Sequence, residues 1–271
     1  ITDEKAMAPS IDGGKLGGEA MSASIGGEAA GDVAIKLGAP FASAFRARPS
    51  VDRQSGAMAY THPIRVPEGR LGLTPEVILS YSSHGRNQDQ NWLGNGWGVS
   101  IPKIERMTRH GTNQIYSPNK FQSSISGDLV HLAAGYYGAR IEKGDFIRYD
   151  FVDDVWTAKT KEGLKYTYGT TTAERMDNPA NPSTIFAWYL SSIEDANGNS
   201  IRYEYDKILG QVYPKRIIYT NAGAQDGIFQ VEFVREAKTN TFESFRSVFG
   251  VTTTQRIARI DVKTNGQVRD R

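Results

Sequence analysis

Cysteine is absent from the 271 residues, and this absence removes several classes of site at once. The chain can form no disulfide, no thiolate metal site and no cysteine nucleophile. A cysteine-free composition fits a cytosolic protein and equally an exported bacterial protein that folds without oxidation. The sequence also lacks an apolar run of about 20 residues, the length that a spanning helix needs. We therefore expect no membrane-spanning segment.

A large excess of charge of either sign is missing as well. The 32 basic and 30 acidic residues give a formal net charge of +2. Proteins that bind nucleic acids or membrane surfaces usually carry a basic patch and a strongly basic balance. This near-balance predicts that nucleic acid is not a partner.

Motifs for catalysis and cofactor binding are missing too. No phosphate-loop, dinucleotide-binding, nucleophile-elbow or HExxH pattern occurs. The segment "GNGWG" (94–98) lacks the lysine of a phosphate loop, and no helical pattern follows it. The widely spaced histidines are expected at the surface or in packing: His62, His84, His110 and His131.

These absences predict a non-catalytic protein with no cofactor and no metal. One enzymatic alternative stays open, a hydrolase that combines His84 or His110 with distant partners. Spacing cannot exclude it, because geometry rather than sequence order defines a catalytic triad.

The first part of the chain, residues 1–45, is rich in Gly, Ala and Ser and nearly free of aromatic residues. Such a composition has little apolar surface to offset the entropy of ordering. We expect either a flexible leader or an extended lead-in that orders against a larger surface. The chain starts with Ile1, and we expect it to be part of a longer polypeptide.

From residue 46 to 271 the pattern changes to alternation of period two. In "VILSY", Val77, Leu79 and Tyr81 share one face of an expected strand. Comparable faces occur at Leu164, Tyr166 and Tyr168; at Ile147, Tyr149 and Phe151; at Val231 and Phe233; and at Ala258, Ile260 and Val262. Turn residues separate these runs, and no apolar stripe of helical period persists. The sequence predicts an all-β protein of short antiparallel strands and hairpins.

One hairpin, residues 186–206, can be read almost residue by residue. Apolar side chains line one face of its two strands: Phe186, Trp188 and Leu190, then Ile201, Tyr203 and Tyr205. The pair Asn197-Gly198 between the strands favours a type I′ turn. Polar residues are expected together on the other face: Arg202, Glu204 and Asp206. The acidic spacing from Asp195 resembles a calcium loop, but Ser200 stands where that loop needs glycine, so the hairpin turn is preferred.

A second segment combines glycine with tryptophan. Gly94, Gly96 and Gly98 allow a sharp bend of the backbone, and Trp97 can cover it as a large apolar plug. We interpret these four residues as a structural corner, with a binding platform as the alternative. Trp92 lies in the polar stretch before them and is a candidate contact residue.

The order of these segments resembles the opening of the SpvB/TcB-type toxin-complex proteins, bacterial relatives of the Rhs and YD-repeat proteins. The resemblance covers the run from Ser55 to Gly111, which includes "LSYSS", "LGNGWG" and "IPKIERMTRHG". It continues through "FQSSISGDLVHL" (121–132), "TKEGLKYTYG" (160–169), "WYLSSIEDANGNSIRYEYD" (188–206) and "YPKRIIYTN" (213–221). Residues 203–206 are similar to the tyrosine-aspartate signature of the YD repeats.

The resemblance implies a section of a spiralling β-shell that encloses a toxic C-terminal segment of the same polypeptide. The implied partners are the rest of that shell, the enclosed segment and a translocation or secretion component, and the implied location is outside the producing cell. The ADP-ribosyltransferase signature of some relatives is not found, so no catalytic residue is transferred. The alternative is a free-standing binding module for carbohydrates or cell surfaces that uses Trp92, Tyr136 and Tyr137 as stacking platforms.

Overall fold

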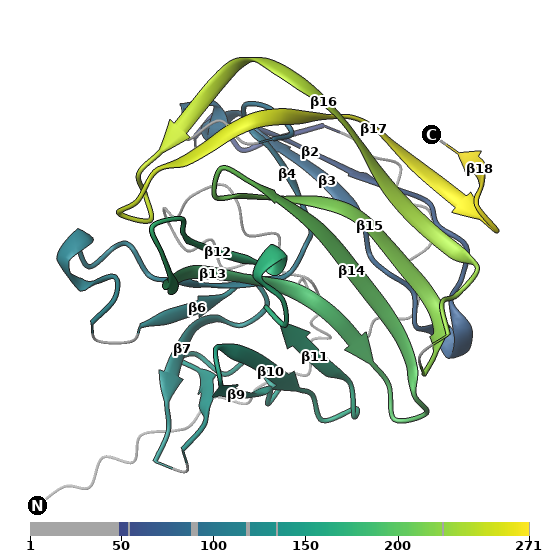
Figure 1. Ribbon diagram of the computed structural model, residues 1–271, viewed down its shortest axis with the longest axis horizontal. Helices are drawn as coiled ribbons and strands as arrows, with labels where there is room; N and C mark the ends of the chain where they lie inside the picture. Colours follow the sequence, from purple (N-terminus) through teal and green to yellow (C-terminus); the bar gives the residue numbers. More distant parts are fainter. Residues whose placement is uncertain are drawn as a thin grey trace, which may run out of the picture.

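The computed structural model describes residues 49–53, 55–87, 92–117, 120–133, 135–223 and 225–270 (Figure 1). The predicted all-β class is confirmed, because antiparallel strands dominate this part of the chain. Its helical segments are four short 3-10 turns, η1 (Arg70–Gly72), η2 (Ser83–Asn87), η3 (Thr112–Gln114) and η4 (Thr172–Glu174). The predicted leader, 1–45, lies outside the described residues.

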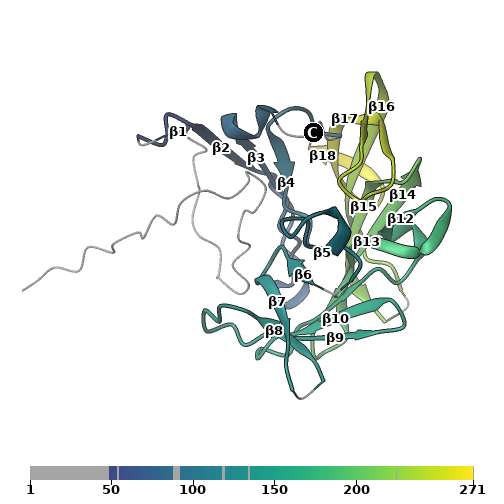
Figure 2. The same ribbon diagram turned by 90° about the vertical axis from the view of Figure 1, so that its left-hand side faces the viewer.

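A small four-stranded sheet comes first in the chain. Its strands lie in sequence order: β1 (Ser50–Val51), β2 (Met58–Pro63), β3 (Ile78–Ser82) and β4 (Trp97–Val99). Leu79 lies opposite Val99, and both pack against the main hydrophobic core, as Val77 does from just before β3. The small sheet therefore stands beside the larger one and shares its core (Figure 2).

The larger sheet closes on itself. Seven consecutive strands pair with their neighbours: β5 (Lys103–Arg106), β6 (Phe121–Ser123), β7 (Gly127–His131), β8 (Tyr137–Ala139), β9 (Arg148–Val152), β10 (Val155–Lys159) and β11 (Lys165–Tyr168). The long strand β13 (Asn181–Glu194) then pairs with β5 through residues 187–189 and with β11 through residues 190–194. β13 is long enough to reach both ends of the series, and these eight strands form a closed ring.

Aromatic side chains fill this ring. Trp156 and Trp188 are buried, and both contact Phe121, with centroid distances of 4.9 and 5.7 Å. Phe151 stacks on Trp156 at 4.6 Å, and Tyr137 meets the same indole edge-on. These rings come from β6, β8, β9, β10 and β13, so one apolar cluster holds strands that are distant in sequence.

The sheet then continues away from the ring as a series of hairpins. Its strands are β14 (Asn199–Ile208), β15 (Gln211–Ala222), β16 (Phe229–Ser244), β17 (Val251–Thr264) and β18 (Gln267–Asp270), and β12 (Arg175–Asn178) lies beside β13. The loop after β16 folds back, so that Phe249 and Val251 pack against Phe186 and Ala187 on the side of β13 away from the main core. This second cluster makes β13 apolar on both faces.

The predicted type I′ turn at Asn197-Gly198 is wrong, because only Gly198 of the pair has positive φ, at +79°. The Asp195 carboxylate accepts hydrogen bonds from the backbone N–H groups of Asn197 and Asn199, and Gly198 N–H donates to Asp195 O. This is a three-residue loop that ends in a left-handed glycine. Pairs with positive φ at both positions, as type I′ requires, occur instead at Asp153-Asp154, Leu209-Gly210 and Asn265-Gly266.

Two predicted faces are interrupted by β-bulges. Ala258 is exposed, because β17 slips at this point relative to β16 and Ile257 packs against the core instead. Phe186 belongs to the second cluster rather than to the face of Trp188 and Leu190, because an irregularity in the β12–β13 pairing lies at this position. An extra residue in one strand reverses the alternation of side chains beyond it.

Strand β18 forms one edge of the larger sheet. It pairs only with β17 within the described residues, and all four of its residues are exposed. An unpaired edge is a template for pairing with another chain. We therefore expect the isolated chain to dimerise or aggregate at micromolar concentration, measured by light scattering. A monodisperse monomer would contradict this prediction.

Candidate functional site

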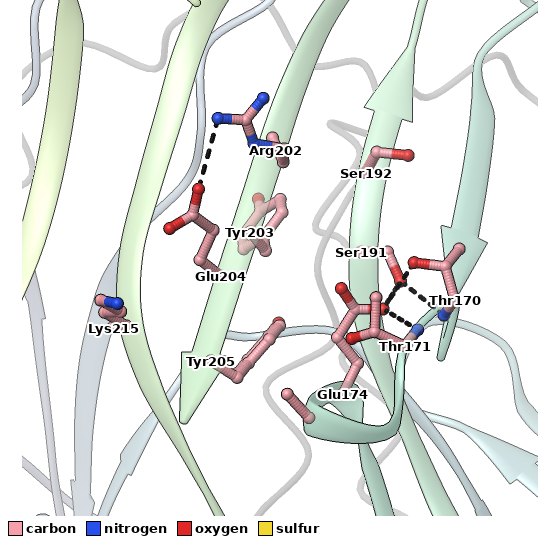
Figure 3. Close-up of a pocket in the computed structure, with 11 residues that line it drawn as sticks. Thr170, Thr171, Glu174, Ser191, Ser192, Arg202, Tyr203, Glu204, Tyr205 and Lys215 are labelled. Atoms are coloured by element: carbon pink, nitrogen blue, oxygen red, sulfur yellow. Dashed lines mark hydrogen bonds and ion pairs between the residues drawn. The ribbon is translucent and has the colours of Figure 1, made fainter. Parts of the chain in front are cut away.

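The main candidate site lies where the edge of β13 passes from one neighbour to another. β14 pairs with β13 only through residues 200–202, opposite residues 194–192. Further back along β13, β5 takes the place of β14 on this edge through residues 187–189, whereas β11 and β12 pair with the opposite edge. A groove of about 470 Å³ opens beside β13 where β14 separates from it (Figure 3). We call it the fork groove; its walls are Thr170, Thr171, Ala173, Glu174, Ser191, Ser192, Arg202, Tyr203, Glu204, Tyr205 and Lys215.

Side chains replace the missing backbone pairing across the fork. The Tyr205 hydroxyl donates a 2.7 Å hydrogen bond to the backbone carbonyl of Leu190, so β14 still reaches β13. Further along, the Lys207 ammonium group pairs with the buried Asp177 carboxylate of β12 at 2.7 Å. Burial raises the pKa of both Tyr203 and Tyr205, which keeps the hydroxyls protonated and able to donate. The two tyrosines that resemble the repeat signature therefore lie at the floor of the fork groove.

Replacing Tyr205 by phenylalanine is expected to lower the free energy of unfolding by about 1–2 kcal/mol, because the buried Leu190 carbonyl loses its donor. Tyr203→Phe is the matched control, since no hydrogen bond from the Tyr203 hydroxyl is found within the described residues, and we expect a change below about 0.5 kcal/mol. Urea denaturation of both variants measures the difference. Equal losses would contradict the bridging role of Tyr205.

Glu174 forms the wall of the groove opposite β14. It closes a capping box with Thr171 at η4, in which each residue bonds the backbone N–H of the other. One of its oxygens, Oε2, accepts three hydrogen bonds: from Thr170 Oγ1 at 2.7 Å, from the Thr171 backbone N–H at 3.0 Å and from the Ser191 hydroxyl. This network fixes the carboxylate at the edge of β13.

Ion pairs cover the rim of the groove. Arg202 contacts Glu204 at 3.3 Å and Asp226 at 2.7 Å, and Arg216 reaches the same Glu204 at 2.6 Å. The polar set predicted for β14 is therefore only partly together, because Asp206 pairs with Lys215 and Arg235 instead.

The glycine-tryptophan corner lies on the small sheet. Gly94 and Gly96 have φ of +122° and +79°, whereas Gly98 has ordinary strand geometry within β4. Trp97 is half-buried, and its ring contacts Tyr81 at 5.3 Å and Tyr60 at 6.2 Å. The structure thus places Trp97 among other aromatic rings, and a structural role for this corner remains our prediction.

Gly96 has the least space of the three glycines. An added Cβ would lie 2.6 Å from the Ser82 carbonyl oxygen and 2.9 Å from the Tyr81 ring. We expect Gly96→Ala to cost about 2 kcal/mol or more of stability, from strain at positive φ together with this overlap. Gly198→Ala has the same φ of +79° but open space and should cost about 1 kcal/mol. Thermal unfolding of both variants separates strain from overlap, and an equal loss would argue against the close contact.

The other predicted residues do not form a site. His62, His84, His110 and His131 are all exposed, and no cluster that could hold a metal ion occurs in the described part of the chain. The backbone carbonyl of Trp92 accepts a hydrogen bond from Ile257 N–H at 2.9 Å and ties the loop before β4 to β17. Tyr136 lies under the Arg148 guanidinium, and Tyr137 packs in the ring core, so neither is a free platform.

Sequence alone did not predict the fork groove. The capping box at residues 171–174 is readable as Thr-x-x-Glu, and it was the available signal for Glu174. No local pattern shows that Ser191 and Tyr205 lie across from it, because that depends on where β13 changes its neighbour.

Comparison with known proteins supports a family assignment. The family model "Salmonella virulence plasmid 65kDa B protein" (SpvB) matches residues 52–144 and 134–251. No curated protein sequence matches the chain. Among the helices of the described residues, none is long and apolar enough to cross a membrane.

Solved structures share the fold. The N-terminal domain of the effector protein SpvB from Salmonella typhimurium strain LT2 aligns with 74% of this chain and 86% of its own, with TM-score 0.63 and 19% identity. TcdB2-TccC3 aligns with 84% of this chain, with TM-score 0.68 and 17% identity. The Photorhabdus luminescens Tc holotoxin pore gives TM-score 0.66 at 17% identity. The chain spans 14% of each of these two toxin chains. With the family model matching most of its length, this chain belongs to the SpvB family.

Proposed function

We propose that the chain is a non-catalytic wall section of an exported bacterial toxin shell that encloses a toxic segment of the same polypeptide. The observation that carries the proposal is the run of hairpins from β13 to β18, each strand paired with the next, which ends in the exposed edge of β18. A sheet of this kind grows by addition of further hairpins, and each addition covers the previous edge. Fold similarity to TcdB2-TccC3 over 84% of the chain supports this proposal.

The side chains described above also support a structural role. The buried polar groups at the fork hold strands together: Tyr205 binds a backbone carbonyl, Lys207 binds Asp177, and Glu174 caps η4. The rest of the shell, the enclosed segment and a translocation or secretion component are the partners that this role requires.

The first test is to read the coding region beyond Arg271. We expect many hundreds of codons with recurring tyrosine-aspartate hairpin units, followed by a dissimilar tail. Electron microscopy of the full-length protein should then show a hollow particle, and the tail should resist protease until the particle is unfolded. A reading frame that stops within a few dozen codons would overturn the shell and favour the free-standing binding module.

A further inference from the structure

Glu174 carries a carboxylate that is buried without a cationic partner. The residue is 8% exposed, and no ion pair to it occurs within the described residues. All three of its side-chain hydrogen bonds come from neutral donors and end on Oε2. The second oxygen, Oε1, has no donor in this part of the chain and points toward the side of the groove formed by β14 (Figure 3). A buried carboxylate is costly unless a charge or further donors compensate it.

The cations that line the groove are already engaged elsewhere. Arg202 is held by Asp226 and Glu204, which also pairs with Arg216. Lys215 reaches Asp206 at 3.8 Å. Among the charged side chains that line the groove, Glu174 is therefore the one without an oppositely charged partner in the described residues.

The floor of the groove suits a flat cation. Tyr203 and Tyr205 lie between Glu174 and the charged rim, and aromatic faces attract guanidinium groups within about 6 Å. The hydroxyl of Ser192 adds a polar group at the wall. A volume of 470 Å³ falls within the range of about 300–1,000 Å³ that is usual for small-ligand sites.

The neighbouring strand offers a place for an extended chain. β14 pairs with β13 only at residues 200–202, and no strand of the described structure pairs with residues 203–208 on the edge of β14 away from β15. Open backbone groups on a strand edge bind an extended peptide by adding a strand, while adjacent pockets select its side chains.

We propose that the fork groove binds an arginine side chain of an extended polypeptide segment, with Glu174 Oε1 accepting from the guanidinium. Arginine is favoured over lysine because its planar guanidinium group can stack on tyrosine and also donates hydrogen bonds in a fixed geometry. This binding role does not depend on the shell role, because it rests on the groove alone.

The test uses two capped pentapeptides that differ at one residue. One carries Thr-Arg-Thr at its centre, and the other carries citrulline, a neutral isostere, in place of arginine. We expect isothermal titration of the full chain to show binding of the arginine peptide and at least tenfold weaker binding of the citrulline peptide. Glu174→Gln should weaken binding of the arginine peptide at least tenfold, whereas Glu162→Gln, at an exposed carboxylate, should not change it.

The Glu174→Gln variant should still fold, because glutamine also serves at this position of a capping box. Its circular dichroism spectrum and unfolding midpoint establish this before titration. Equal affinity of the two peptides, unchanged affinity of Glu174→Gln, or no binding of the arginine peptide at millimolar concentration would each overturn the proposal.

Discussion

Replacing Phe121 by alanine is expected to lower the free energy of unfolding by about 3–5 kcal/mol. The side chain has no exposed surface, and its ring contacts four others: Tyr137, Phe151, Trp156 and Trp188. These rings come from four other strands of the closed ring, so the cavity would loosen contacts around much of its circumference. The Arg106 guanidinium also lies 5.0 Å from the centre of the Phe121 ring, and the substitution would remove this cation–π contact.

The matched control is the same substitution at an exposed site. Phe146 is 67% exposed, and Phe146→Ala should change the stability by less than about 0.5 kcal/mol. Urea denaturation followed by far-UV circular dichroism measures both variants without relying on tryptophan emission, which the Phe121 cavity would itself alter. Similar losses for the two variants would contradict the placement of Phe121 at the centre of the ring.

The period of side-chain alternation was sufficient to predict the fold class. Tyr166 and Tyr168, Ile147 and Tyr149, and Val231 and Phe233 are buried as the alternation requires. It failed at Ala258 and Phe186, because each lies at a β-bulge, and a bulge depends on the register of the partner strand. Nothing in the sequence of one strand reveals that register.

The turns show how local and distant information combine. Asn265-Gly266 has positive φ at both positions, as an Asn-Gly pair favours. Asn197-Gly198 has the same two residues but forms a longer loop, because the preceding Asp195 carboxylate holds the backbone N–H groups of Asn197 and Asn199. Leu209-Gly210 has positive φ at both positions without a favourable first residue. Residue pairs thus predict that a turn occurs, while flanking side chains decide its type.

The fork groove and the ring closure are the features that sequence reasoning could not reach. The ring closes where β13 pairs with β5, which lies about 80 residues earlier in the chain. Such non-local pairing produces no periodic pattern in the sequence. The fork exists because β14 pairs with only three residues of β13 before β5 takes over that edge. Strand length and neighbour choice are properties of the assembled sheet rather than of any segment.

Glu105 provides the largest expected pH effect. It is 5% exposed, and three side chains from different parts of the chain bind its carboxylate: Lys103 at 2.7 Å, Gln122 at 2.6 Å and Arg246 at 2.8 Å. Burial by itself would raise the pKa of Glu105. The charges of Lys103 and Arg246, with the hydrogen bonds from Lys103 and Gln122, outweigh burial and lower the pKa from 4.5 to about 2.

A folded-state pKa below the unfolded value means that the ionised carboxylate stabilises the fold. The contribution is about 3 kcal/mol, is complete above about pH 5, and is lost as the pH falls toward 2. Glu105→Gln removes the charge and leaves Lys103 and Arg246 without the carboxylate that they share, which should cost about 3 kcal/mol at pH 7. At pH 3 the wild type has lost about 2 kcal/mol of this stabilisation. The free energies of unfolding of wild type and Glu105→Gln should therefore become similar.

Urea denaturation at pH 7, 5, 4 and 3 tests this convergence. The difference between wild type and Glu105→Gln should stay constant from pH 7 to 5 and then shrink. Glu162→Gln is the control, because its side chain is 53% exposed and its difference from wild type should stay near zero throughout. A Glu105→Gln difference that is the same at pH 7 and pH 3 would show that Glu105 is not held ionised. In that case Arg246, which reaches Glu105 from the loop after β16, would not lock that loop against β5 through charge.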